Sequence, residues 1–383
     1  MRILHTADWH LGLSLHGISL VNDQRHVLEQ ILRIAEEEQP DVVIIAGDVF
    51  DRSSPPPDAV TLLDRVIGRL VLDLGRKVIL ISGNHDNGER IGCFSDLLQQ
   101  RGLHLFGVPR IPLPSVTVTD VFGPVRLFVL PYLEPHVARY LMGDESIRTQ
   151  QQAYEALLRT IPEVPDERRV LVGHAFVAGG QSTGSERQLS VGGAEAVPAE
   201  IFAPFSYVAL GHLHCPQQLL HGKVRYPGSL LAYSFDEAGQ EKSVEIVDIR
   251  NDGSCDIRRI PLVPLRAMRR VRGRIVRGEF DLDGSDPIPQ TEDFVEVTLH
   301  NDEPVADAMS IVQARYPNAL KLRWERSPAS SVSTTTTMEE IRRKTPLGLL
   351  KDFFLMVQGK EMSDAQIALG QKAVEEVERE VLS

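Results

Sequence analysis

The sequence predicts an α/β protein: a sandwich of two sheets flanked by helices, followed by a small α+β module and C-terminal helices. Three observations lead to this prediction. The first hundred residues alternate short apolar runs with segments of helical periodicity, which is typical of layered α/β domains. From about residue 103 to residue 264 most apolar segments are strand-like, with few long helices between them. The length of 383 residues also exceeds one core of the commonest size, so we expect more than one domain.

The N-terminal strands are predicted from β-branched apolar runs, which suit a sheet that is covered on both faces. These runs are Arg2–Ala7, Val42–Ala46 and Val78–Ser82. A helix is predicted over Asn22–Glu38, with Asn22 as its N-cap. Two more helices are expected over residues 58–72 and 91–100. The predicted buried side of the first of these consists of Val60, Leu63, Ile67 and Leu70.

Strand-like segments predominate in the next part of the chain and would complete the sandwich. They are Leu103–Val108, Val116–Val121, Arg126–Leu130, Val170–Gly173, Tyr207–Leu210 and Ser243–Ile249. In the small module we expect strands at Arg270–Arg277 and Phe294–Leu299 and a helix at Ala306–Ala314. Two amphipathic helices are expected after it, and the second opens with the capping-box pattern Ser363-x-x-Gln366.

Four regions follow from these patterns. Residues 1–264 form the main domain and residues 265–326 the small α+β module. Residues 327–338 are rich in Ser and Thr and cannot bury a core, so a flexible linker is expected there. Residues 339–383 contain the tail helices, whose apolar faces need a covering surface. That surface could lie on this chain, but the linker favours another protein.

Composition indicates a cytoplasmic protein that does not enter membranes. The three cysteines are widely spaced and odd in number, which argues against a disulfide framework and fits a reducing compartment. No run approaches the roughly 18 apolar residues of a membrane span, and the first residues lack the pattern of a secretory signal. The formal net charge is −12, so any binding of nucleic acid would have to be local or mediated by metal.

Five short segments carry metal-ligand chemistry, and each follows a predicted strand. They are Asp8-Trp9-His10, Gly47-Asp48-Val49-Phe50-Asp51, Gly83-Asn84-His85-Asp86, Gly173-His174 and Gly211-His212-Leu213-His214. Loops at strand ends converge in α/β proteins. In an extended chain, residues i and i+2 point the same way, so Asp8 and His10 can face one point, as can His212 and His214. Glycines before several of these residues allow close backbone approach.

Together these segments supply seven oxygen or nitrogen donors and no thiolate: Asp8, His10, Asp48, Asn84, His174, His212 and His214. This mixture suits divalent ions such as Mn, Fe or Zn and argues against a structural zinc knot. Seven donors are too many for one tetrahedral ion. Two ions that share a bridging carboxylate would use them well.

The five segments resemble the signature of the calcineurin-like metallophosphoesterase superfamily, and the predicted sandwich would then be the fold of that superfamily. The stretches Thr6–Gly12 and Ala46–Asp51, with Ser53–Pro56, are similar to the SbcD-type nuclease subunits of DNA double-strand-break repair. The resemblance implies two ions, usually manganese. One would be bound by Asp8, His10, Asp48 and His214, and the other by Asp48, Asn84, His174 and His212.

The resemblance also implies a mechanism in which the ions bind the phosphate and activate a water molecule. His85 would stabilise the added charge or protonate the leaving oxygen. Asp51 or Asp86 could orient a histidine, although either could instead cap a turn.

The resemblance implies two partners: double-stranded DNA ends and hairpins, and a coiled-coil ATPase of the SbcC type. A second copy of this chain is also expected, as a homodimer within a heterotetramer. The apolar faces of the helices at residues 58–72 and 91–100 could form that homodimer. The sequence has no phosphate-binding Gly-x-x-x-x-Gly-Lys-Ser/Thr loop, so any ATP dependence would come from the partner. The small module and the tail fall where such proteins have a DNA-contacting cap and partner-binding helices.

One local feature favours DNA as the substrate. Eight arginines and no acid occur between residues 258 and 277, at positions 258, 259, 266, 269, 270, 272, 274 and 277. Arg269, Arg270, Arg272 and Arg274 are the candidate DNA contacts, because arginine suits phosphate. The alternative is a strand face whose arginines pair with acids elsewhere. For the whole protein, a small-substrate phosphodiesterase or phosphatase is the alternative, and a non-catalytic end-binding scaffold is a third possibility.

Overall fold

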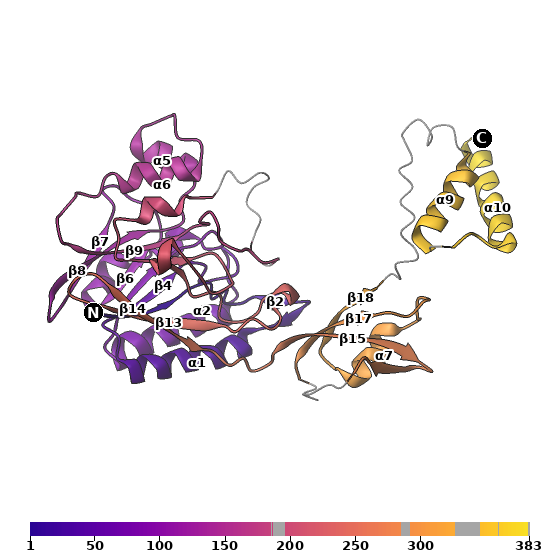
Figure 1. The fold of residues 1–383 in the computed structure, drawn as a ribbon, viewed down its shortest axis with the longest axis horizontal. Coiled ribbons are helices and arrows are strands. Elements are labelled where there is room, and N and C mark those ends of the chain that lie inside the picture. The colour runs from indigo at the N-terminus through magenta and orange to yellow at the C-terminus, as the bar shows by residue number, and fades with distance from the viewer. Residues whose placement is uncertain (185, 187–195, 285–291, 326–344, 359, 382–383) are drawn as a thin grey trace. The chain divides into compact units, whose positions relative to one another are not determined.

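The computed structural model describes residues 1–184, 186, 196–284, 292–325, 345–358 and 360–381 (Figure 1). The chain forms two compact units, Met1–Arg269 and Arg270–Ser383. The predicted linker at 327–338 lies outside the described residues. In the part that is described, no helix is both long and apolar enough to cross a membrane.

The first unit contains two six-stranded mixed sheets. The first sheet has the order β14 (Cys255–Pro261), β13 (Ser243–Ile249), β1 (Arg2–Thr6), β4 (Val42–Ala46), β5 (Lys77–Ile81), β6 (Leu103–Phe106). Strands β1, β4, β5 and β6 are parallel, whereas β13 runs antiparallel to β1. The carboxyl ends of β1, β4 and β5 therefore meet at one edge of the sheet.

The second sheet has the order β11 (Gln217–Leu219), β12 (Val224–Tyr226), β10 (Tyr207–Gly211), β9 (Arg168–His174), β8 (Gly123–Leu130), β7 (Ser115–Asp120). Its central strands β8, β9, β10 and β12 are parallel, and both edge pairs are antiparallel. The two sheets pack face to face, so the predicted two-sheet sandwich flanked by helices is confirmed.

Successive side chains of a strand point to opposite faces of its sheet, and this alternation explains how the sheets and helices form layers. In β4, Val42, Ile44 and Ala46 point into the core between the sheets, where they meet residues of the second sheet such as Val172. The opposite face of β4 is buried as well. Helices α1 (Val21–Glu38) and α2 (Pro57–Gly68) lie along this outer side (Figure 1). Burial on both faces accounts for the continuous apolar run.

A second apolar cluster covers the outer face of the second sheet. Residues of α5 (Pro135–Met142) and α6 (Gln150–Leu158) pack there against residues of β8, β9 and β10. The remaining short elements of this unit are β2 (Ser14–Leu15), β3 (Ile18–Ser19), the π-helix η1 (Arg69–Asp73), α3 (Gly88–Ile91), α4 (Ser95–Leu98), and the 3-10 helices η2 (Gln99–Arg101), η3 (Ala199–Phe202), η4 (Leu220–Gly222) and η5 (Phe235–Glu237).

The second unit contains a four-stranded sheet and a helical pair. The sheet has the order β16 (Glu279–Leu282), β15 (Met268–Val276), β17 (Phe294–Leu299), β18 (Ala319–Trp324) and packs against α7 (Ala308–Arg315). Helices α9 (Pro346–Gln358) and α10 (Asp364–Val381) approach closely at Gly370, where a Cβ atom would lie 2.8 Å from Cδ2 of Leu350. The Ser363–Gln366 capping box is present, with Ser363 N donating to Gln366 Oε1 at 2.9 Å.

Three local predictions were wrong, and several elements were missed. Helix α1 begins one residue earlier than expected, and Asn22 binds Arg25 instead of capping it. Val60 is 46% exposed because Ala59 and Leu62 carry the buried face of α2. The helix expected at 91–100 is broken into the short α3 and α4, with Phe94 in the left-handed region between them. Strands β11, β12, β14, β16 and β18 were not predicted, nor were helices α5 and α6.

A buried polar network crosses between the two sheets. Arg225 of the second sheet donates to Glu245 of the first at 2.7 Å, and Tyr207 donates to the same carboxylate at 3.0 Å. His5 Nδ1 lies 2.8 Å from the Tyr207 hydroxyl, and its Nε2 has no hydrogen-bond partner among the described residues. Burial lowers the pKa of His5 to about 3, and the charge of Arg225 acts in the same direction. His5 therefore stays neutral inside the folded protein.

This network predicts a pH-dependent stability. The folded pKa of His5 is about 3 and lies below the unfolded value of 6.5, so the unfolded chain takes up the proton first as the pH falls. The His5 contribution is complete above pH 6.5 and decreases as the pH falls toward 3. Between pH 6.5 and 5 the free energy of unfolding should decrease by ~2 kcal/mol more in the native chain than in His5→Gln. Urea unfolding with a chelator present measures this difference. His136→Gln, at a side chain that is 64% exposed, is the control, and equal pH slopes in all three proteins would contradict the assignment.

Candidate metal centre

All seven predicted metal donors come together at the carboxyl ends of parallel strands. Asp8 and His10 follow β1, Asp48 follows β4, and Asn84 follows β5. The other three donors come from the second sheet. His174 is the last residue of β9, and His212 and His214 follow β10. The two sheets therefore contribute to one cluster, and Asp8, Asp48, His10, His174 and His214 in it are each no more than 2% exposed.

The first group of donors lies around Asp8, His10 and Asp48, whose ligand atoms lie within 4.8 Å of one another. His10 Nε2 is 3.1 Å from His214 Nε2 and 3.7 Å from Asp48 Oδ2. Asp8 Oδ1 accepts a hydrogen bond from the His212 amide at 2.8 Å. The Nε2 atoms of two histidines thus face each other beside two carboxylates.

The second group combines Asp48, His174 and His212, again within 4.8 Å, so Asp48 belongs to both groups. Asn84 Oδ1 is 3.0 Å from His174 Nε2 and 3.0 Å from His212 Nδ1. His174 Nδ1 lies 2.8 Å from the Ala46 carbonyl and donates to it, which directs Nε2 toward Asn84 and Asp48. The shared position of Asp48 is the geometry expected for a bridging carboxylate.

The convergence of Asp8 with His10 has a different cause from the one predicted. An extended segment was expected, but Asp8 and His10 have φ values of 52° and 45°. Asp48 also lies in the left-handed region, with φ 48°. Such angles are uncommon for residues other than glycine and cluster at functional sites, where surrounding contacts fix them. Turns, and not strand alternation, therefore aim these side chains.

The side chains of the cluster interact strongly with one another. With the protein's own charges alone, burial raises the pKa of Asp8 to about 7. Burial also disfavours the charged forms of Asp48 and His174. Their mutual attraction outweighs this effect, so the pKa of Asp48 falls well below its usual value and that of His174 rises to about 9. Burial, followed by the charge of His174, lowers the pKa of His212 to about 3.

The residues present fit divalent cations. Asp8 Oδ2 is buried and has no hydrogen-bond partner in the part of the chain that the structure describes. A buried carboxylate oxygen without a partner is costly, and a nearby cation would remove that cost. Carboxylate, amide and imidazole donors together match metals of intermediate character.

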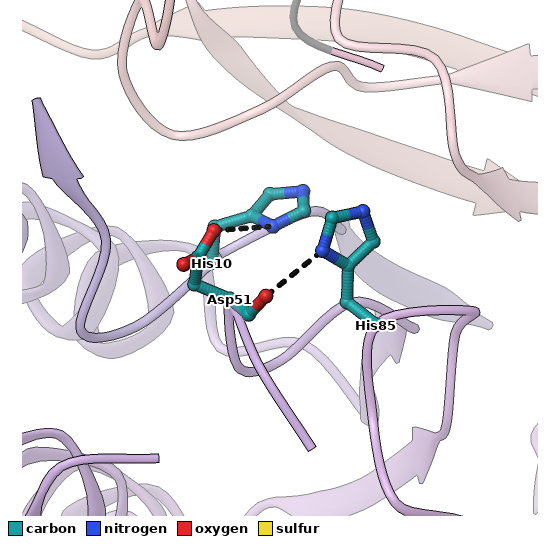
Figure 2. Close-up of side chains that lie close together, drawn as sticks. All are labelled: His10, Asp51 and His85. Atoms are coloured by element: carbon teal, nitrogen blue, oxygen red, sulfur yellow. Dashed lines mark hydrogen bonds and ion pairs between the residues drawn. The ribbon is translucent and has the colours of Figure 1, made fainter. Parts of the chain in front are cut away.

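His85 lies at the edge of this cluster with His10 and Asp51 (Figure 2). The rings of His10 and His85 are 4.7 Å apart, edge to face. His85 Nδ1 donates to the backbone carbonyl of Asp51 at 2.9 Å, which leaves Nε2 for other contacts. The Asp51 carboxylate lies 3.9 Å from His10 Nδ1. Asp51 therefore contacts His85 through its backbone carbonyl and His10 through its carboxylate.

The Asp86 carboxylate binds backbone and not a histidine. It accepts from the amides of Val49, Phe50 and Gly83 at 2.9–3.0 Å. These bonds join the loop after β4 to the loop after β5. Asp86 could have oriented a histidine or capped a turn, and the observed contacts are those of the second role.

Two glycines are required by close packing at the centre. A Cβ atom on Gly83 would lie 2.1 Å from Asp48 Oδ1. On Gly47, which has φ +87°, it would lie 2.4 Å from His174 Nδ1. The predicted close approach of backbone to the ligand side chains is confirmed at both positions.

The sequence interpretation missed several residues that hold the loops of the centre. Gln24 of α1 donates to the His10 carbonyl at 2.7 Å and accepts from the Gly12 amide at 3.1 Å. Tyr233 packs edge to face on His10 and His214 and donates its hydroxyl to the Trp9 carbonyl. Glu237 contacts His214 and pairs with Lys242. None lies in a recognisable motif, so only the fold identifies them.

The arginines between residues 258 and 277 are largely paired with acids. Arg270 donates to Glu296 at 2.8 Å, Arg272 to Glu325 at 2.7 Å, and Arg274 to Asp281 at 3.4 Å. In the first unit, Arg258, Arg259 and Arg266 pair with Glu38, Glu245 and Asp23. The sequence left open whether these arginines pair with acids elsewhere in the chain, and at these six positions they do.

Comparison with solved structures finds many distantly similar proteins, of which three serve as examples. The protein TT1561 of Thermus thermophilus is 14% identical, with a TM-score of 0.39, over 67% of this chain and 98% of that one. GAP50, the anchor in the inner membrane complex of Plasmodium, is 10% identical, with a TM-score of 0.40, over 88% and 99%. A dimetal phosphatase from Danio rerio is 12% identical, with a TM-score of 0.38, over 64% and 91%.

Family models match two parts of the chain. Residues 1–216, which include all seven donors and His85, match the calcineurin-like phosphoesterase family. Residues 264–358 match the SbcD_C family, described as the type 5 capsule protein repressor C-terminal domain. The resemblance noted in the sequence is confirmed by both matches. The chain therefore belongs to the calcineurin-like phosphoesterase family and carries an SbcD C-terminal domain, a combination consistent with an SbcD-type nuclease subunit.

Proposed function

We propose that this chain is the nuclease subunit of an SbcCD-type complex in DNA repair and recombination. It would hydrolyse phosphodiester bonds at double-strand ends and hairpins, in the cytoplasm. The observation that carries this proposal is the presence of a phosphoesterase domain and an SbcD C-terminal domain in one chain. The phosphoesterase family alone does not distinguish DNA from small phosphoesters, whereas the second domain favours the nuclease.

The proposed cofactor is a pair of divalent ions, most simply Mn²⁺. One ion would be held by Asp8, His10, Asp48 and His214, and the other by Asp48, Asn84, His174 and His212. The two overlapping donor groups and the unpartnered Asp8 oxygen support this assignment. When bound, such ions neutralise phosphate charge and lower the pKa of a water molecule toward neutrality, which supplies the nucleophile.

His85 is proposed as the residue that protonates the leaving oxygen. Its Nδ1 proton is committed to the Asp51 carbonyl, so the ring can donate a proton only from Nε2 and only as the doubly protonated imidazolium, which becomes neutral on the transfer. Breaking the phosphorus–oxygen bond leaves an alkoxide, which takes up this proton. Asp51 fixes the ring by its carbonyl, and Asp86 fixes the loop that carries His85.

A partner for the tail helices is part of the proposal. Phe353 of α9 and Leu369 of α10 are 58% and 71% exposed. An SbcC-type coiled-coil ATPase is the proposed partner, in a heterotetramer that contains two copies of this chain. The ATPase would supply the ATP dependence that the phosphoesterase domain cannot supply.

We propose that DNA contacts one group of cationic side chains on the four-stranded sheet of the second unit. Glu296 is 1% exposed and interacts with three partly exposed cations, Arg270, Lys321 and Arg323. Lys321 and Arg323 share this single carboxylate, so these two side chains keep an excess of positive charge that suits phosphate. Arg272 and Arg274 have carboxylates of their own and contribute less. Arg269 is retained from the sequence as a neighbouring candidate.

Substrate class can be tested with the full chain loaded with Mn²⁺. We expect cleavage of a labelled hairpin-ended duplex, stimulated by an SbcC-type ATPase and ATP. Bis-p-nitrophenyl phosphate serves as the small substrate. Rapid hydrolysis of that ester with no cleavage of any DNA, even with the ATPase bound, would favour the small-substrate phosphodiesterase instead.

The role of His85 predicts a separation of metal binding from hydrolysis. His85→Gln should keep its metal content, measured by elemental analysis, because His85 is not one of the seven donors. Its hydrolysis rate should fall by about 10²- to 10⁴-fold, the usual contribution of a general acid. His136→Gln is the control on the surface of α5. Full activity of His85→Gln with normal metal content would remove this residue from the mechanism.

The cation group predicts a change in the salt dependence of duplex binding. In the double variant Lys321→Ala with Arg323→Ala, Glu296 keeps its partner Arg270 and the module should remain folded. The slope of log K against log salt should become shallower by about 2, because each phosphate contact contributes about 0.9. Arg250→Ala, in an exposed pair with Asp256, is the control. An unchanged slope in the double variant would show that DNA binds elsewhere.

A further inference from the structure

Behind His214 lies a buried ion pair that belongs to none of the metal-ligand segments. Glu237, at the end of η5, is fully buried, and Lys242, directly before β13, is 5% exposed. Lys242 Nζ donates to Glu237 Oε2, to the His214 carbonyl at 2.8 Å and to Ser229 Oγ at 3.0 Å. Both charged groups are thus fixed by several short contacts.

Stability alone does not explain such a pair. Removing two opposite charges from water costs several kcal/mol per ion, and apolar residues of similar volume often replace a buried pair without loss of stability. The contacts of this pair converge on one residue instead. Lys242 holds the backbone of His214, and Glu237 Oε1 lies 3.4 Å from His214 Nδ1.

These contacts determine how His214 presents its ring. A carboxylate beside Nδ1 keeps the proton on that nitrogen. The lone pair of Nε2 then points toward His10, whose Nε2 is 3.1 Å away in the group with Asp8 and Asp48. A carboxylate partner also makes an imidazole a stronger metal donor than a neutral partner does.

The other half of the centre is built differently. His174 Nδ1 donates to the carbonyl of Ala46, a neutral acceptor at 2.8 Å. His212 Nδ1 faces the side-chain oxygen of Asn84, which is itself a proposed donor to the same ion. The carboxylate support of Glu237 thus falls on a histidine of the first group. The two proposed ions would therefore be held with unequal support.

We propose that Glu237 and Lys242 are positioning residues for the ion bound by Asp8, His10, Asp48 and His214. Glu237 fixes the tautomer and orientation of His214, and Lys242 fixes Glu237 together with the loop that carries His214. This inference rests on the proposed metal centre, but not on DNA being the substrate. Glu237 and Lys242, which lie outside every metal-ligand segment, would thus determine how tightly one of the two ions binds.

The test compares metal binding by the full-length native chain with Glu237→Gln and Glu241→Gln. Binding of Mn²⁺ to the metal-free protein is followed by calorimetry and by elemental analysis after dialysis. In Glu237→Gln we expect one ion to bind about 10- to 100-fold more weakly, the usual effect of removing such a partner, and the other ion to bind as in the native chain. Glu241 is exposed in the same loop, so Glu241→Gln should bind both ions normally.

A second variant separates positioning from folding. Glu237→Gln leaves Lys242 buried without its counter-charge, which destabilises proteins. The double variant Glu237→Gln with Lys242→Met removes both charges. It should unfold at a temperature close to that of the native metal-free chain and still show the selective loss of one ion. Nitrogen NMR of the Zn²⁺-loaded proteins should show His214 metallated at Nε2 and protonated at Nδ1 only when Glu237 is present.

Three results would overturn the proposal: normal binding of both ions in the double variant, equal weakening of both ions, or an unchanged His214 tautomer in Glu237→Gln. The proposed nuclease activity is tested separately. A chain that binds both ions, shows the selective effect of Glu237→Gln and yet cleaves no DNA would contradict the proposed substrate and leave the role of Glu237 intact.

Discussion

The centre depends on one electrostatic constraint: two aspartates and several histidines are buried together, and their charges must balance. Asp48 lies where the two donor groups overlap and is held in the ionised form by its neighbours, whereas burial opposes ionisation of Asp8. A compact group of this kind gains most when further positive charge is present among the carboxylates. The loops, glycines and surrounding polar residues can be understood as the means of keeping these side chains in contact despite the cost of their burial.

That cost explains why the surroundings of the centre are so fully hydrogen-bonded. Left-handed backbone at Asp8, His10 and Asp48 is uncommon, and it persists because contacts from distant parts of the chain fix it. Gln24 binds the turn after β1, and Asp86 joins the two loops after β4 and β5. The fold thus supplies rigidity at the same positions where the sequence supplies metal donors.

The sequence predicted the parts of the structure that depend on local pattern. The buried parallel strands and all seven donors could be found because apolar runs and short motifs adjoin one another. The local reason given for the convergence of Asp8 and His10 was wrong, since backbone angles in turns are not visible in a periodicity. Gln24, Tyr233 and Glu237 could not be found, because each acts through contacts with residues far away in the chain. Short edge strands such as β11 and β16 lack the length that makes a pattern distinct.

The position of β13 has a consequence for biosynthesis. This strand follows all seven donors in the sequence, yet in the first sheet it lies directly beside β1, between β1 and β14. Because domains are completed only after their last strand has left the ribosome, a nascent chain that ends before β13 exposes one side of β1. It also lacks an intact first sheet. An incompletely synthesised chain would therefore lack the neighbour of β1, the strand that leads directly into Asp8 and His10.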